Sequence, residues 1–303
     1  MPFNKPRTKF GRNYRAIIED RSHRQVVIEP PITMEFTVER SRSSSSNVTH
    51  MRLYNLSRDH REALQKNRWN EQFNRRFELY VGYDSLGKVL PRVGFGNLNR
   101  VFSVREGSDV ITTVESYDGG WASQQARSNL NIPSGTRVAT IVDLLVDDLV
   151  KFGIKRGVIS PMEGVTDKAS TYSGYTDDLL YTVTGGASFI DNGFVHVLDD
   201  KSGIRSSIVI NERTGLLDTP IRETAYIYYT MIFEPTIKLG NIIDIQSRTG
   251  IRVNGEHQVI EISHSGIVSP VVSGRMTTRI GVLNRSGLRP LFPRRRTRDN
   301  AIF

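Results

Sequence analysis

Alternating apolar and polar positions mark the first part of the chain. Between residues 32 and 39, Ile32, Met34, Phe36 and Val38 alternate with threonine or glutamate at each odd position. Because successive side chains of a strand point to opposite faces, this period of two predicts a half-buried strand. The pattern recurs at residues 77–83, and β-rich runs at 99–104 and 110–117 flank a turn at 106–109. Residues 12–118 therefore predict an antiparallel sheet or barrel.

One short helix is expected inside this β-rich part. Ser57 is a candidate N-cap, and Asp59 and Glu62 suit the positive end of a helix dipole that begins there. The serine-rich segment 41–47 before it predicts a flexible loop between two strands.

The apolar period changes in the middle of the chain. From Arg137 to Phe152 the apolar residues recur at helical spacing and stop before Gly153, which predicts a helix over this range. A shorter helix is predicted for residues 177–183, with Thr176 as its cap.

After these helices the sequence returns to β patterns. Residues 187–190 and 194–198 predict a hairpin around the turn Asp191-Asn192-Gly193. We therefore expect residues 119–204 to form a small α+β unit. Further short β runs separated by Gly, Pro or Asn predict a second barrel or sandwich, at residues 206–210, 225–233, 241–246, 258–263 and 275–283.

These elements predict a mainly β chain with an α+β insertion. Two β units flanking a helical one suggest a duplicated architecture. The strand expected at 225–233 is apolar on both faces, which is typical of a strand that is covered on both sides, as at a subunit junction. The expected division is a basic arm at 1–11, a first β domain at 12–118, an α+β domain at 119–204, a second β domain at 205–284 and a basic arm at 285–303.

The positive charge is concentrated toward the ends of the chain. The net charge of +9 predicts an anionic partner, which could be nucleic acid, a lipid surface or an acidic protein face. The C-terminal arm is rich in Pro and Arg and cannot bury apolar area by itself, so it orders against a neighbour or stays a solvated tail. We expect its arginines to bind a protein partner, with the candidate residues Arg289, Arg294, Arg295, Arg296 and Arg298.

Catalysis finds little support in the sequence. The absence of cysteine excludes a disulfide framework, a thiolate zinc site and a Cys nucleophile. The segment from Gly82 to Lys88 matches most of a phosphate-binding loop, but Val89 stands where a Mg²⁺-binding Ser or Thr is needed. Paired aspartates such as Asp147 and Asp148 are adjacent and point apart. We expect no catalytic residue, no cofactor and no metal site.

No apolar run approaches the ~20 residues of a membrane span, and no signal peptide is visible at the N-terminus. We therefore expect the chain to be made and folded in a cytoplasm.

Several motifs, taken in order and spacing, resemble one family. The first set resembles the first tube-like domain of bacteriophage baseplate hub proteins and consists of Met51–Arg61, Leu79–Tyr83, Glu106–Asp109 and Glu115–Gly119. The second set resembles the second half of the same family and consists of Asp191–Gly193, Glu212–Pro220, Glu234–Gly240 and Gly255–Val259. The likeness extends over residues 50–285.

The resemblance implies two tail-tube-like antiparallel β-barrel domains that flank the α+β domain. Hubs of this family are trimers, and three subunits with two barrels each imitate a ring of six. The implied partners are the sixfold tail tube protein, the threefold central spike, other baseplate proteins and the tape measure protein. DNA would cross the central channel without sequence-specific binding, and the location would be the virion, after assembly in the bacterial cytoplasm.

Two other functions remain open at this point. A tail-tube or tube-initiator protein shares the barrel but usually has one per chain. A basic nucleic-acid-binding module should interleave aromatic and basic residues on one strand face. The aromatic strand around Tyr226 and Tyr228 lacks such basic residues between Arg222 and Lys238.

Overall fold

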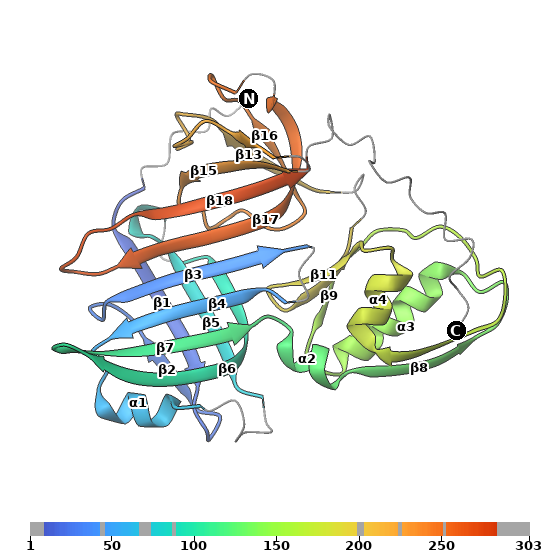
Figure 1. The fold of residues 1–303 in the computed structure, drawn as a ribbon, viewed down its shortest axis with the longest axis horizontal. Coiled ribbons are helices and arrows are strands. Elements are labelled where there is room, and N and C mark those ends of the chain that lie inside the picture. The colour runs from blue at the N-terminus through green and yellow to red at the C-terminus, as the bar shows by residue number, and fades with distance from the viewer. Residues whose placement is uncertain are drawn as a thin grey trace.

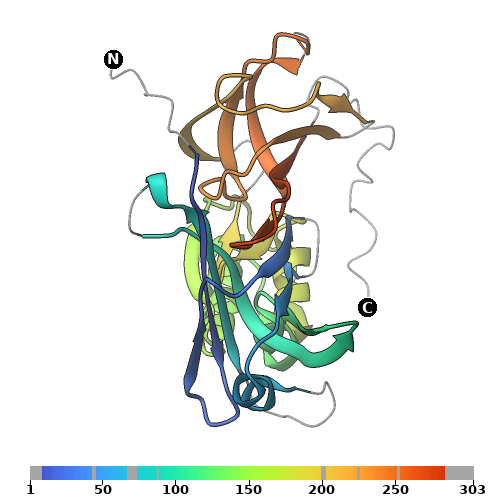
Figure 2. The ribbon, with the colours of Figure 1, turned by 90° about the vertical axis from the view of Figure 1, so that its left-hand side faces the viewer.

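The computed structural model describes residues 9–42, 46–66, 74–86, 89–198, 203–223, 226–250 and 253–283. The fold has two β-rich halves and a middle part that contains the longer helices. Figure 1 shows the first half in blue to green, the middle part beside it in green to yellow, and the second half in orange. Figure 2 shows the second half above the first.

The first half contains a curved antiparallel sheet whose pairing order is β2-β1-β5-β6-β7-β4-β3. Helix α1 (Arg58–Leu64) follows β4, and Ser57 Oγ accepts a hydrogen bond from the backbone N–H of His60, so the predicted N-cap is confirmed. A 3-10 helix at Asp84–Leu86 follows β5. The strands are β1 (Arg12–Glu19), β2 (Gln25–Ile28), β3 (Met34–Ser41), β4 (Val48–Tyr54), β5 (Arg76–Tyr83), β6 (Arg92–Glu106) and β7 (Asp109–Tyr117).

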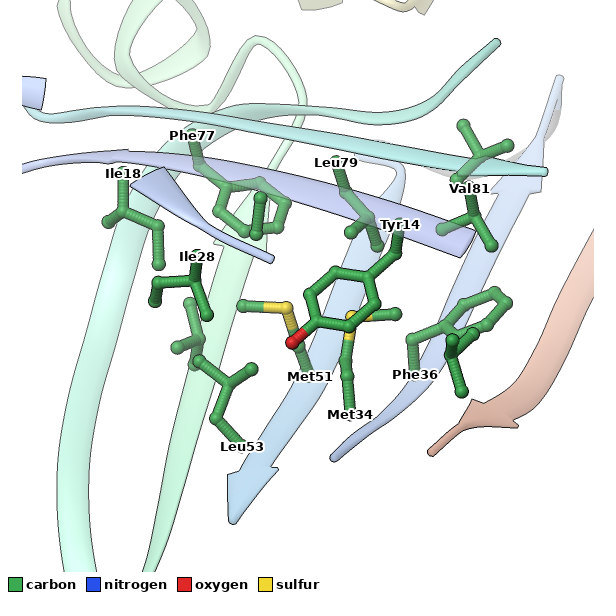
Figure 3. Packing of buried hydrophobic residues seen from close by; sticks show 14 of the residues in the cluster. Tyr14, Ile18, Ile28, Met34, Phe36, Met51, Leu53, Phe77, Leu79 and Val81 are labelled. Carbon is green, nitrogen blue, oxygen red and sulfur yellow. The ribbon is translucent and has the colours of Figure 1, made fainter. Parts of the chain in front are cut away.

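This sheet folds over on itself around one hydrophobic core. Figure 3 shows Tyr14 and Ile18 of β1 and Leu79 of β5 pointing toward Met34 and Met51 of β3 and β4. The even-numbered residues of β3 from Met34 to Val38 are buried, and the odd-numbered ones remain partly exposed. The alternation in the sequence therefore predicted this strand and its inward face correctly.

Strand β6 carries the chain around the corner of the sheet. Its first residues pair with β5 and the rest pair with β7, and a register shift lies between Leu98 and Arg100. Gly96 lies in this bend with φ of 156°, and a Cβ there would overlap the backbone carbonyl of Tyr117. A glycine is therefore required at this close approach of two strands.

The middle part is an α+β arrangement around a core of its own. Helices α3 and α4 pack together over short strands, and Ile141, Leu145 and Leu149 of α3 are buried. The elements are α2 (Gly120–Gln125), β8 (Arg127–Ile132), α3 (Val138–Val150), β9 (Lys155–Ile159), β10 (Ser170–Tyr175), α4 (Thr176–Val183), β11 (Ser188–Asp191) and β12 (Phe194–Val197). The predicted long helix and hairpin are confirmed.

Thr176 does not cap α4 as predicted. The N-cap residue is Tyr175, and its side chain makes no capping bond. Thr176 is instead the first helical residue and is buried, with its Oγ1 2.9 Å from Oγ of Ser128. The hydroxyl is held by a neighbouring strand, which the local sequence does not reveal.

The second half has strands β13 (Ile204–Ile210), β14 (Ile221–Arg222), β15 (Tyr226–Ile232), β16 (Asn241–Ile245), β17 (Gly255–Val268) and β18 (Met276–Leu283). They pair in the order β13-β16-β17-β18-β15-β14 around a third hydrophobic cluster. Strand β17 bends in the same way as β6, because its start pairs with β16 and a register shift follows between Val259 and Glu261.

The two halves share one strand order. In order along the chain, β1, β3, β4, β5, β6 and β7 correspond to β13, β14, β15, β16, β17 and β18, and both sets pair in the same spatial order. Strand β2 has no counterpart among the described residues of the second half, and β13 pairs parallel with β16 whereas β1 pairs antiparallel with β5. The suggested duplication is therefore visible in the topology.

The halves join through one strand pair. Strand β3 pairs antiparallel with β17 from Met34↔Val268 to Ser41↔Glu261, so that a single large sheet continues from one half into the other (Figure 1). Among the described residues, its pairing order runs from β14 to β2 without closing. The fold is thus mainly β with large antiparallel sheets.

Candidate functional site: a polar face across both halves

One face of the large sheet carries many polar side chains from β15 to β6. The inward residues of β3, β4, β7, β17 and β18 are packed in the cores, and their alternate neighbours point the other way. Along one row across the strands, Arg279, Ser263, Glu39 and Val48 lie in register. We call this surface the polar face, and it includes Glu35, Thr37, Glu39, His50, Arg52, Arg100, Glu106, Thr113, Glu115, Tyr228, Thr230, Glu261, Ser263, Ser265, Thr277 and Arg279.

Ion pairs and hydrogen bonds hold the charged groups of the first half in place. The guanidinium of Arg52 lies 3.4 Å from Glu35 Oε2 and 3.2 Å from Glu106 Oε2. Glu115 Oε1 accepts hydrogen bonds from Asn99 Nδ2 and from the hydroxyl of Tyr117, each at 2.7 Å. The carboxylates of Glu35, Glu106 and Glu115 are therefore held in place by ion pairs or hydrogen bonds.

The part of the face near the seam between the halves is hollowed. The hollow has a volume of about 310 Å³ and is lined by Glu39, Glu261, Ser263, Tyr228 and Arg279, among others. The hydroxyl of Tyr228 donates to Glu261 Oε2 at 3.2 Å, and the guanidinium of Arg279 lies 4.2 Å from the centre of the Tyr228 ring.

A buried polar cluster lies beneath this seam and links all three parts of the chain. Arg40 of β3 is 3% exposed and lies 3.4 Å from Asp191 Oδ1 of β11. Its guanidinium also donates to the carbonyl oxygen of Ile237 at 3.1 Å and lies 2.9 Å from His264 Nε2. Since arginine only donates, His264 Nε2 must accept, which places the proton of the neutral ring on Nδ1, 2.8 Å from Thr278 Oγ1.

Burial changes the ionisation of His264 and of Asp118, a further member of this cluster that interacts electrostatically with Asp191 and Arg40. Burial and the neighbouring Arg40 charge hold the pKa of His264 well below its usual range, in keeping with the neutral ring. Burial and the Asp191 carboxylate raise the pKa of Asp118 to about 7, although its Oδ1 accepts a 2.9 Å hydrogen bond from the Gly193 N–H. The cluster therefore contains one buried carboxyl that titrates near neutral pH.

One sign of this cluster is present in the sequence, although the prediction did not include it. In the alternation Met34, Phe36, Val38, Arg40, the last residue occupies an inward position although it is charged. A charge at a core position needs a buried partner. The partners themselves lie in distant segments, and no local pattern identifies them.

The arginines predicted to bind partners, Arg289, Arg294, Arg295, Arg296 and Arg298, lie outside the described residues. Within the described ranges there is no group of three or more His, Asp or Glu side chains that could hold a metal ion. Within the same ranges, no helix has the length and apolar character that crossing a bilayer requires.

Aromatic and basic side chains do meet on several strands. Arg100 lies 4.2 Å from the ring centre of Phe102 and Arg52 lies 5.8 Å from that of Tyr54, both on the polar face, and Arg92 lies 4.4 Å from that of Phe95. These pairs come from i and i+2 or i+3 spacing on a strand. The interpretation from sequence concerned only the strand around Tyr226 and therefore did not include them.

Solved structures share this fold. A 43 kDa tail protein of prophage MuSo2 from Shewanella oneidensis aligns with a TM-score of 0.56 and 10% identity, covering 88% of this chain and 97% of that one. A tail protein from Neisseria meningitidis aligns with a TM-score of 0.59 and 7% identity, covering 91% and 98%. The c3393 protein of Escherichia coli, a component of the type VI secretion system, aligns with a TM-score of 0.54 and 8% identity, covering 88% and 76%.

No curated protein matches the sequence significantly. The sequence does match the family described as "Baseplate hub gp41" over residues 15–266, which is most of the chain and extends from the first half into β17 of the second half. This family consists of structural proteins of the phage tail. The chain therefore belongs to the baseplate hub gp41 family.

Proposed function

We propose that the chain is the subunit of a trimeric hub that joins the sixfold tail tube to a threefold central spike. The observation that carries this proposal is the shared strand order of the two halves. A closed ring of three copies, each with two similar β units, presents six similar positions around its axis and can therefore imitate a ring of six. The adaptor then presents six similar surfaces to the tube and three to the spike.

In the proposed trimer, the strand pairing between neighbouring copies would be equivalent to the strand pairing between the two halves of one chain. Inside the chain, β3 pairs with β17. By the strand correspondence, β14 and β6 are the equivalents of these two strands. Within the described residues, β14 ends the pairing order, and the later part of β6 pairs on its second edge only through the isolated bridge Lys66↔Val101. We infer that β14 of one copy pairs with β6 of the next.

Exposed apolar side chains at both edges support this interface. Ile221 of β14 is 58% exposed and Val104 of β6 is 47% exposed. Leu217, in the segment before β14, and Ile232 of β15, whose N–H donates to the Gly215 carbonyl of that segment, are exposed as well. Unpaired edges with exposed apolar residues are expected to be covered in the assembled protein.

The polar face would line the central channel. Its carboxylates, from Glu35, Glu39, Glu106, Glu115 and Glu261, outnumber its guanidiniums, from Arg52, Arg100 and Arg279, although the whole chain has a net charge of +9. A surface without excess positive charge does not retain the phosphates of passing DNA. The surplus positive charge would instead face protein neighbours, with Arg289 and Arg294–Arg298 among the contacts.

Three hydrophobic clusters, each drawn mainly from one part of the chain, support the proposed division into domains. Residues 12–118 and 205–284 would form the two tail-tube-like domains, in an open rather than closed form within one chain, and residues 119–204 the α+β domain between them. The barrel would close only around the ring of subunits. As a non-enzymatic virion protein assembled in the bacterial cytoplasm, the hub would meet the tube, spike and tape measure proteins there.

Native mass spectrometry of the purified chain tests the proposal. The expected species has three times the 34.3 kDa mass of one chain. A hexamer would favour the tail-tube alternative, in which each subunit supplies one β unit to the ring. A monomer at micromolar concentration that also ignores purified tube and spike proteins would overturn the adaptor role.

A further inference from the structure

A second cavity lies away from the polar face, where the first half meets the middle part of the chain. It has a volume of about 250 Å³. The first half contributes Arg76 of β5 and Arg92 and Phe95 of β6, and the middle part contributes Phe152, Lys155 and Phe194. We call it the basic pocket.

The floor of the basic pocket is held in a fixed arrangement. The ring of Phe95 packs against Gly193, whose φ is 77° and where a Cβ would overlap the ring. The guanidiniums of Arg92 and Arg76 lie 4.4 Å and 5.4 Å from the centre of the Phe95 ring. Arg92 also donates a 2.8 Å hydrogen bond to the carbonyl oxygen of Asn192. Two segments about a hundred residues apart therefore position these cations together.

Positive charge is in excess in this pocket. Glu78 forms ion pairs with Arg76 and, at 3.9 Å, with Arg92. Lys155 is exposed, its Nζ lies 6.0 Å from the centre of the Phe194 ring, and it forms no ion pair among the described residues. One carboxylate thus faces three cations, which leaves the pocket able to bind further negative charge.

An unsatisfied acceptor in the pocket narrows the class of ligand. Asn192 lines the pocket, and its Oδ1 is buried with no hydrogen-bond donor among the described residues. A buried acceptor left unpaired is unfavourable, so rotation of the Asn192 side chain toward a ligand that supplies an N–H is favoured. Phosphate groups at neutral pH offer acceptors to this site, whereas a peptide offers both N–H donors and carboxylates.

The size of the basic pocket and its aromatic residues also favour a peptide over a nucleic acid. A pocket of about 250 Å³ holds one or two side chains and is too small to track a nucleic-acid backbone. Two guanidiniums already lie over the ring of Phe95, so that ring is not a free platform for base stacking. Phe152 and Phe194 are partly exposed and offer apolar contact to a peptide side chain.

We propose that the basic pocket binds an acidic peptide segment of a neighbouring tail protein. A carboxylate of the segment pairs with Lys155 and Arg76, and an apolar side chain packs on Phe152 and Phe194. The Asn192 side chain turns so that its Oδ1 accepts a hydrogen bond from a backbone N–H of the segment. The inference concerns a surface separate from the polar face, and it does not depend on the number of copies in the hub.

Fluorescence anisotropy with purified chain tests the pocket. The probe is a labelled decapeptide of alternating glutamate and leucine, and the comparison probes are the same peptide with glutamine in place of glutamate and a labelled deca-thymidylate. Lys155→Glu is the test variant, since Lys155 is exposed and the change leaves the packing intact. Arg213→Glu, an exposed arginine in a turn of the second half, is the matched control.

The expected result is salt-sensitive binding of the acidic peptide, weaker by about tenfold in Lys155→Glu and unchanged in Arg213→Glu, with little binding of the glutamine peptide. Equal binding by both variants would overturn the proposal, as would no binding of the acidic peptide. Binding of the oligonucleotide alone, lost in Lys155→Glu, would also overturn it and assign the pocket to nucleic acid. Unchanged circular dichroism spectra establish that both variants are folded.

Discussion

The Arg40 guanidinium lies 2.9 Å from Nε2 of His264 although both side chains are buried and come from different halves of the chain. This contact bridges the strand pair β3–β17, which joins the two halves into one sheet. With Asp191 of the middle part on the same guanidinium, Arg40 connects all three cores. Arg40 and its buried partners therefore add a polar link between the two β units to the strand pair that joins them.

Replacement of Arg40 with methionine should lower the free energy of unfolding by about 3–5 kcal/mol, because Asp191 would keep a buried charge without its partner. Arg52→Met is the matched control, since its ion pairs with Glu35 and Glu106 are at the surface and should contribute about 0–1 kcal/mol. Urea denaturation measures both. Equal effects of the two variants would contradict the assigned role of Arg40.

Asp118 should make stability depend on pH. Its pKa rises from 3.8 unfolded to about 7 folded, because it is buried next to Asp191. Between pH 3.8 and about 7 the folded state therefore binds one proton more than the unfolded state. The stability that this proton contributes is fully present below pH 3.8 and is lost as the pH rises to about 7.

Asp118→Asn isolates this effect, since an amide oxygen can still accept from the Gly193 N–H. The variant should gain stability relative to the parent as the pH rises from about 4 to 7, at up to about 1.4 kcal/mol per pH unit, and the difference should level off above pH 7. Thermal melts across this range measure it. A difference that is independent of pH would show that Asp118 stays ionised throughout.

Two glycines in left-handed conformations allow the cost of backbone strain to be measured apart from the cost of a steric overlap. Gly193 and Gly135 have φ of 77° and 80°, but a Cβ at Gly193 would overlap Phe95, whereas nothing lies within 4 Å of one at Gly135. Gly135→Ala should cost about 1 kcal/mol from backbone strain alone. Gly193→Ala should cost about 1–3 kcal/mol more, because Phe95 must move. Chemical denaturation at one pH would reveal whether the two losses differ as expected.

Much of the fold follows from local patterns in the sequence. Strands such as β3 and β5, and helix α3, stand out because one face is largely apolar. Strand β1 was not predicted, although Tyr14, Ala16 and Ile18 alternate inward, because the small side chain of Ala16 and the arginines nearby weaken the apolar signal. The polar strands β8 and β10 pair mainly with each other and carry little alternation.

Long-range pairing cannot be predicted from local patterns. The seam joins residues 34–41 to residues 261–268, and nothing in either segment identifies the other. The same limit applies to the basic pocket, where Phe95 meets Gly193, and to the buried cluster around Arg40. The sequence did indicate two β units, and the shared strand order that relates them emerges only from the topology.

The proposed contact between copies can be trapped chemically, because the chain contains no cysteine. A chain with Val104→Cys on β6 and Ile221→Cys on β14 should form disulfides between copies on oxidation, and reduction should remove the resulting bands from a denaturing gel. The control pairs Val104→Cys with Val158→Cys, since Val158 is 45% exposed but lies in the middle part. Crosslinking of the control pair with equal yield would contradict the specific contact.

Electron cryomicroscopy of the assembled baseplate measures the arrangement of the halves directly. We expect three copies of the chain around the tail axis, with the six β units forming one continuous sheet and with Glu39, Ser263 and Arg279 facing the lumen. A ring in which the polar face points outward, or in which the two halves of a chain do not occupy equivalent positions, would contradict the proposed adaptor.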